Sequence, residues 1–181
     1  MAKAKEITEL DCSAGALKSA VKILRVRFKE IIEINEKTLD LSDVDFIHDL
    51  RVATRRLRSA LRDFMPLLER ELFKEIKEDL KEIADALGKV RDEDVAIEAL
   101  QNLQIGAESD LIKLQLGLFL QERNNSREAA RLELEKLLTN EKLEELEKDF
   151  TEKLHKILHS KDLHQTISFK EFGKTVIGKN L

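Results

Sequence analysis

Five arginines and one histidine lie within residues 47–64, in the stretch IHDLRVATRRLRSALRDF, which contains only two aspartates. Advancing about 100° per residue along a helix places four of these arginines within about 80° of His48. The four are Arg51, Arg55, Arg58 and Arg62. Because arginine donates paired hydrogen bonds to phosphate and keeps its charge, this face of the helix could bind a phosphate-containing anion.

The apolar side chains of the same stretch occupy nearly the opposite side of the helix. They are Phe46, Leu50, Ala53, Leu57, Leu61 and Phe64. Arg56 alone leaves the basic face and falls between Asp49 and Asp63, as an ordinary solvated charge does. The arginines are therefore sorted to one face, and the apolar face is predicted to enter a core.

Basic side chains align on three other predicted helices as well. The three sets are Lys18, Lys22, Arg25 and Lys29; Lys74, Lys77 and Lys81; and Arg123, Arg127 and Arg131. One such set is usually a solvated face or half of a salt-bridge ladder. Four sets in a chain with a net charge of −4 favour convergence on one groove, where they repel one another unless an anion is bound. Arg123 and Arg127 fall within the apolar arc of their helix, so each needs a partner.

Helical spacing of the apolar residues and a single proline among 181 residues predict an all-α protein. The predicted helices cover residues 13–38, 45–65, 68–87, 108–139 and 141–159, with a short helix after Asp92. Ser13 is a candidate N-cap, Pro66 ends or kinks the second helix, and Gly88 ends the third.

Ser168 and Glu171 have the spacing of a capping box, which predicts one more helix near the C-terminus. We expect an antiparallel bundle of about five to six helices with a basic groove or pore. Residues 1–160 would form this bundle, and residues 161–181 would begin an additional C-terminal helix.

Composition points to a cytoplasmic protein that does not enter a membrane. Cys12 is the only cysteine, so no intrachain disulfide can form. The N-terminal residues MAKAKEITEL lack the apolar region of a signal peptide, and the apolar runs are too short to cross a bilayer.

The segments HDLRVATRRLRSAL and LGKVRDEDV, in that order, closely resemble the paired motifs of the CHAD family, the conserved histidine α-helical domain. The matching residues are His48, Asp49, Leu50, Arg51, Val52, Thr54, Arg55, Arg56, Leu57 and Arg58, followed by Leu87, Gly88, Arg91, Asp92, Asp94 and Val95.

The resemblance implies an all-helical fold around a basic pore that binds inorganic polyphosphate and does not hydrolyse it. It implies a non-catalytic protein without a cofactor, in the cytoplasm or at polyphosphate granules. His48, Arg51, Arg55, Arg58 and Arg62 would line the pore. The basic sets of the other three helices would add to it, and Arg91 is a further candidate ligand. Asp92 and Asp94 are expected to act structurally, at a helix start or in orienting arginines.

Family members usually contain a second, similar helical repeat with its own histidine motif. None of His155, His159 and His164 begins such a motif here. The chain therefore resembles the N-terminal half of the family's domain, either as a fragment or as a natural half-domain. For a half-domain we expect a twofold homodimer that rebuilds the pore.

Four other functions each have some support in the sequence. The basic face could bind nucleic acid, although the chain has no tyrosine or tryptophan for base stacking. The His48-Asp49 pair is found in metal-dependent phosphohydrolases, but adjacent helical residues do not face each other. His155 and His159 have the i,i+4 spacing of a zinc site, without the glutamate of a metalloprotease. An acidic helix at 141–159 suits a scaffold or adaptor.

Overall fold

The computed structural model describes residues 4–8, 10–37, 41–159 and 167–179. Within these ranges the chain is all-helical and forms no β-strand, which confirms the predicted fold class. The elements are α1 (Ala16–Lys37), α2 (Val44–Phe64), a short 3₁₀ helix η1 (Met65–Leu67), α3 (Lys74–Gly106), α4 (Asp110–Leu137), α5 (Asn140–His159) and α6 (Phe169–Lys179).

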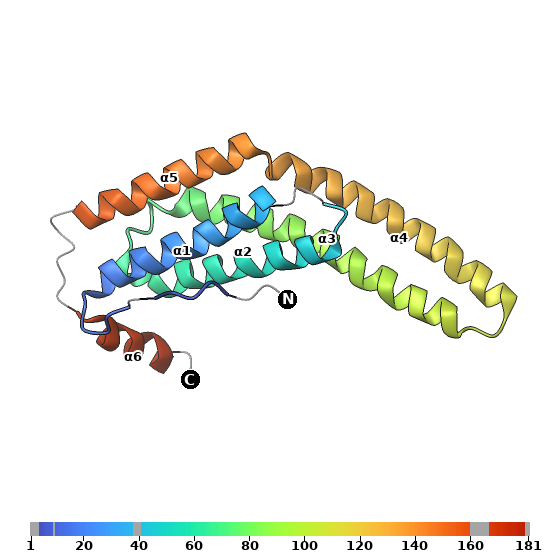
Figure 1. Cartoon of the computed structure of the whole chain (residues 1–181), viewed down its shortest axis with the longest axis horizontal. Helices are drawn as coiled ribbons and strands as arrows, with labels where there is room; N and C mark the ends of the chain where they lie inside the picture. Colours follow the sequence, from blue (N-terminus) through green and yellow to red (C-terminus); the bar gives the residue numbers. More distant parts are fainter. Residues whose placement is uncertain (1–3, 9, 38–40, 160–166, 180–181) are drawn as a thin grey trace.

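The helices form a bundle with a long hairpin projecting from it (Figure 1). Helices α1 to α4 alternate in direction, and α5 continues from α4 back across the bundle. Helix α2 packs against both α1 and α3, and the second half of α3 pairs with α4 to form the hairpin. The bundle therefore places α2 between α1 and α3, which carry two of the other three predicted basic sets.

The apolar face of α2 enters the core as predicted. Its six predicted core residues are all buried, and Ile47 and Thr54 are buried with them. Phe150 brings α5 onto the same core, because its ring stacks on Phe28 of α1 at 4.7 Å and meets Phe73 edge-on at 6.2 Å. Pro66 ends α2 as expected, since the chain turns into η1 directly after Phe64.

Helix α6 begins with the predicted capping box. Ser168 Oγ donates to Glu171 Oε2 at 2.8 Å, and the Glu171 backbone N–H donates to Ser168 Oγ at 3.3 Å. The helix docks at the end of the bundle, where Phe172 is buried and its ring lies 5.9 Å from that of Phe64. Because α6 shares the core of the bundle, the domain boundary placed near residue 160 stays a prediction.

Three predicted helix ends are wrong. Gly88 does not end the third helix, and Asp92 does not begin another, because α3 runs without a break from Lys74 to Gly106. Leu87 and Val90 are fully buried on either side of Gly88, and this packing outweighs the weak helix propensity of one glycine. Ser13 does not cap α1, since its hydroxyl donates instead to Asp11 Oδ1 at 2.6 Å and the helix begins at Ala16.

None of the helices in the described part of the chain combines the length and the apolar character that crossing a bilayer requires.

Candidate functional site

The basic face of α2 divides into a half-buried beginning and an exposed end. His48 and Arg51 are half-buried, whereas Arg55, Arg58 and Arg62 are exposed. The opposite, apolar face anchors the helix in the core, which fixes the direction in which the basic side chains leave it. The sorting of charge that the helical spacing predicts is therefore present in the structure.

The exposed end of this face borders a depression between α2 and α3. The depression has a volume of about 480 Å³ and is lined by Arg55, Arg58, Ser59, Leu61, Arg62, Lys77 and Lys81. None of these described residues is a carboxylate. Arg62 Nε does contact the neighbouring Asp63 Oδ1 at 3.1 Å, but this exposed ion pair is weak. We call this site the α2–α3 depression.

Helices α2 and α3 thus bring two of the four predicted basic sets together. Lys77 and Lys81 lie one turn apart on α3 and meet three arginines of α2. Lys74 is exposed one turn before Lys77, and His48 and Arg51 precede Arg55 on the same face of α2. Ser59 also lines the depression and was not predicted. Its hydroxyl can donate to an anion, but a search for charged residues alone passes over it.

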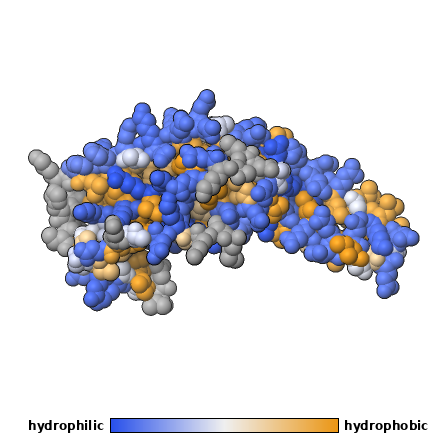
Figure 2. Space-filling model, in the orientation of Figure 1, coloured by the Kyte–Doolittle hydropathy of each residue, from blue (hydrophilic) through white to orange (hydrophobic). Residues whose placement is uncertain are grey.

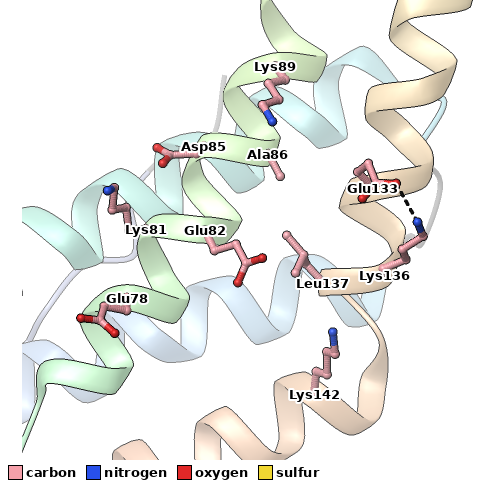
Figure 3. Close-up of a pocket in the computed structure, with 10 residues that line it drawn as sticks. All are labelled: Glu78, Lys81, Glu82, Asp85, Ala86, Lys89, Glu133, Lys136, Leu137 and Lys142. Atoms are coloured by element: carbon pink, nitrogen blue, oxygen red, sulfur yellow. Dashed lines mark hydrogen bonds and ion pairs between the residues drawn. The ribbon is translucent and has the colours of Figure 1, made fainter.

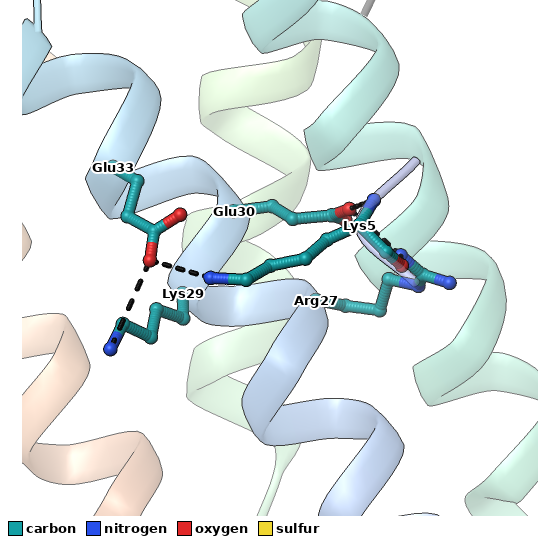
Figure 4. A network of polar contacts seen from close by, with 5 residues as sticks. All are labelled: Lys5, Arg27, Lys29, Glu30 and Glu33. Atoms are coloured by element: carbon teal, nitrogen blue, oxygen red, sulfur yellow. Dashed lines mark hydrogen bonds and ion pairs between the residues drawn. The ribbon is translucent and has the colours of Figure 1, made fainter. Parts of the chain in front are cut away.

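Lys29 of the basic set on α1 lies away from α2. Lys18, Arg25 and Lys29 are exposed, and Lys29 lies on the side of α1 away from α2, where Glu33 is 3.8 Å from its ammonium group (Figure 4). Lys5 also binds Glu33, at 2.6 Å, so this carboxylate serves two lysines. On the side facing α2, Arg27 binds Glu30 at 2.8 Å. No residue of the α1 set lines the α2–α3 depression, and ligation by this set stays a prediction.

The arginines of α4 are paired with carboxylates. Arg127 Nε donates to the buried Asp94 Oδ1 at 2.5 Å and its Nη2 donates to the Ser42 carbonyl at 3.1 Å. Arg123 contacts Glu93 of α3 at 3.3 Å. The expectation that these arginines need partners on the protein is confirmed.

Arg131 on the same helix binds Glu128 at 2.7 Å and Glu135 at 3.3 Å. The hydrogen bond to Glu128 is the main cause that raises the pKa of Arg131 above its usual value. A polyanion would have to compete with carboxylates for all three arginines of α4, whereas the cations of the α2–α3 depression border no carboxylate of the lining. Whether Arg123, Arg127 and Arg131 bind a ligand stays a prediction.

Arg91, Asp92 and Asp94 lie within α3 and not at the start of a helix. The structural part of their interpretation holds for Asp94, which orients Arg127. Arg91 is half-buried, does not line the α2–α3 depression, and its role as a ligand stays a prediction.

A larger depression, of about 650 Å³, lies between α3, α4 and the beginning of α5 (Figure 3). Its charged lining consists of Glu78, Glu82, Asp85, Glu133, Lys81, Lys89, Lys136 and Lys142. Glu133 and Lys136 form an ion pair at 2.6 Å. Acids and bases are balanced there, so it attracts a polyanion less than the smaller depression does.

Among the described residues, those considered for metal binding do not assemble a site, and His164 lies outside the described residues. In the ranges that the structure describes, no three His, Cys, Asp or Glu side chains are grouped to hold a metal ion. The His155 and His159 rings stack at 4.1 Å, and His159 Nδ1 lies 2.9 Å from the His155 carbonyl oxygen. That ring nitrogen is therefore engaged with the backbone.

Searches of curated proteins and of solved structures found no match to this chain. A comparison with protein-family models did find one, and it covers nearly the whole chain. The model of the CHAD domain matches residues 22–180, which include α2, the α2–α3 depression and the paired motifs quoted above. The chain belongs to the CHAD domain family.

Proposed function

We propose that this protein binds inorganic polyphosphate through the α2–α3 depression and does not hydrolyse it. The observation that carries the proposal is the lining of that depression, where three arginines of α2 meet two lysines of α3 and no described lining residue is a carboxylate. Such a cluster of cations repels itself, and binding a polyanion relieves the repulsion. The association of the CHAD domain with polyphosphate binding supports this choice of ligand.

The length of the basic face favours a linear polyanion over a single phosphate. His48 and Arg62 are fourteen residues apart on one helix, which corresponds to about 21 Å along its axis. A single phosphate could reach only one or two of these side chains, whereas a chain of phosphates can meet a new cation at every turn. Arginine suits this role because its planar group offers two parallel donors to each phosphate.

Nucleic acid is the competing ligand, since its backbone presents similar charges. The chain has no tyrosine or tryptophan, so it lacks two of the side chains on which bases stack most readily. We therefore expect long-chain polyphosphate to bind in the presence of excess single-stranded DNA or RNA. Equal competition, charge for charge, would reduce the proposal to a general affinity for polyanions.

The decisive experiment compares two triple variants with the same change in net charge. Arg55→Ala/Arg58→Ala/Lys77→Ala removes cations from the depression, and Lys148→Ala/Lys156→Ala/Lys170→Ala removes exposed lysines from α5 and α6. Titration with polyphosphate at several salt concentrations should show loss of binding in the first variant only. Equal weakening in both would show that net charge, and not the depression, determines affinity.

The non-catalytic part of the proposal needs a separate measurement. We expect no release of inorganic phosphate when the protein is incubated with polyphosphate, with or without added divalent cations. Phosphate release that disappears in a His48→Ala variant would overturn it and assign His48 to a hydrolytic site.

A further inference from the structure

The far half of the α3–α4 hairpin exposes an unusual number of large apolar side chains. Figure 2 shows them as hydrophobic surface at the end of the hairpin, away from the bundle. Six of them are between 55% and 82% exposed, namely Leu103, Ile105, Leu111, Leu114, Leu118 and Phe119. They bring no benefit to the isolated chain, because apolar surface in water costs free energy.

The exposed area is large enough for a specific protein interface. At about 100 Å² for each of these side chains, the six present roughly 600 Å² of apolar surface. A stable interface buries about 800 Å² per partner, of which the three leucines of α4 supply roughly 300 Å², and the flanking side chains of α4 would supply the rest.

Three of the leucines form a stripe on the outer face of α4. Leu111, Leu114 and Leu118 follow one another at intervals of three and four residues, and all are exposed. Further steps of three and four reach the exposed residues Gln121, Asn125, Glu128 and Leu132. Alternating steps of three and four keep side chains on one face of a helix, as they do in helices that pack against one another along their length. The α4 stripe, as we call Leu111, Leu114 and Leu118, therefore fits a partner helix.

Charge is nearly absent around the α4 stripe. Charged residues make up 38% of the whole chain, yet residues 111–121 contain only Lys113. Depletion of charge is the compositional mark of an interface core. The hairpin is also held in shape, since Gln104 Nε2 donates to the Lys113 carbonyl at 3.0 Å and Arg123 binds Glu93 further along. A preformed surface loses less entropy on association.

We propose that the α4 stripe is a self-association surface, which pairs with the α4 stripe of a second copy of this chain about a twofold axis. A second copy supplies the same seam spacing and the same uncharged surface, as an isologous contact requires. The hairpin projects beyond the bundle, so two hairpins can meet while the bundles stay apart (Figure 1). The contact involves neither α2 nor the lysines of α3, so it stands independently of polyphosphate binding.

Sedimentation velocity over a range of protein concentrations tests the proposal. The wild-type chain should pass from monomer to dimer, and Leu114→Glu/Leu118→Glu should weaken association at least about a hundredfold, because it places like charges across the axis. Val44→Glu/Ile177→Glu makes the same charge change at exposed apolar residues outside the hairpin and should dimerise as the wild type does. A monomeric wild type, or a dimer that the stripe variant retains, would overturn the proposal.

A cross-link provides a second measurement that does not rely on a disruptive variant. In a Cys12→Ser background, Leu114→Cys should oxidise to a covalent dimer much faster than Ile177→Cys, because only the former lies on the α4 stripe. Equal rates would contradict the pairing. A wild-type monomer that binds vesicles of neutral phospholipid through the same leucines would assign the surface to a membrane and also overturn it.

Discussion

Arg127 on α4 donates a 2.5 Å hydrogen bond to Asp94 on α3, and this pair joins the two helices. The side chain of Asp94 is 2% exposed and that of Arg127 is 14% exposed. Leaving one member of a buried pair without the other is costly, because a charge then remains without a partner away from water.

We expect Asp94→Ala to lower the free energy of unfolding by about 3 kcal/mol. The double variant Asp94→Ala/Arg127→Ala should lose less than the sum of the two single losses, since it leaves no unpaired charge. Urea unfolding measures all three. Glu128→Ala, which removes an exposed partner of Arg131, is the matched control and should change little. Additive losses would mean that Asp94 and Arg127 do not interact in solution.

Gly88 lies inside α3, and a methyl group there would meet no atom within 4 Å. We therefore expect Gly88→Ala to raise the free energy of unfolding by about 0.5–1 kcal/mol, because alanine restricts the unfolded chain and suits a helix. Thermal or urea unfolding checks the sign. A loss of stability would indicate that the helix is interrupted at this residue, as the sequence alone suggested.

The capping box of α6 predicts a pH dependence. Hydrogen bonds from Ser168 lower the pKa of Glu171 below its usual value of 4.5. The stabilisation is therefore present above pH 4.5 and disappears as the pH falls through the lower pKa of the folded state. Ser168→Ala should lower the midpoint of thermal unfolding at neutral pH, and the difference from the wild type should shrink in acid to what the bond from the Glu171 backbone N–H to Ser168 Oγ contributes. A difference that is as large at low pH as at neutral pH would contradict the role of the ionised carboxylate.

The pKa of Asp79 is shifted in the direction opposite to that of Glu171, so its effect on stability also has the opposite sign. Burial, and then its neighbours Glu82 and Glu75, raise the pKa of this carboxyl above its usual value of 3.8. The charged form is disfavoured in the folded protein, so the penalty is absent below pH 3.8 and complete above the raised pKa. Asp79→Asn should raise the midpoint of thermal unfolding at neutral pH and have no such effect in acid. Lys81→Gln, on the same helix, is a control for removing a charge of the other sign.

The salt dependence of polyphosphate binding should distinguish the basic residues that line the α2–α3 depression from the carboxylate-paired arginines of α4. Each phosphate contact that is lost should reduce the slope of log affinity for polyphosphate against log salt by about 0.7. We expect this change for Arg55→Ala and for Lys77→Ala, which line the α2–α3 depression. Arg123→Ala should change the slope less, because Glu93 and Glu122 already neutralise this arginine. A full change of slope for Arg123→Ala would extend the site onto α4.

Local chemistry made several elements predictable. The end of α2 at Pro66, the capping box of α6 and the division of α2 into basic and apolar faces each depend on residues within a few turns of one another. The continuity of α3 through Gly88 does not, because it depends on the burial of Leu87 and Val90 by tertiary packing. For α3, local propensity therefore predicted the correct type of element but the wrong end.

The candidate site was also predictable only as far as local sequence determines it. Helical spacing identified which side chains share a face, and this succeeded for α2 and for Lys77 and Lys81 on α3. Spacing within one helix carries no information on how two helices face each other. The sequence therefore could not show that Lys29 points away from α2 or that Asp94 would take Arg127 as its partner.

Helix α3 runs without interruption from Lys74 in the bundle to Gly106 at the tip of the hairpin. From Lys81 to Gly106 it extends about 38 Å, at 1.5 Å per residue. One continuous helix thus connects the cationic depression to the apolar tip and sets the distance between them. In a pair of chains joined at their tips, this spacing would set the shortest polyphosphate that can occupy both depressions at once, and only longer polymers would gain from binding at two points.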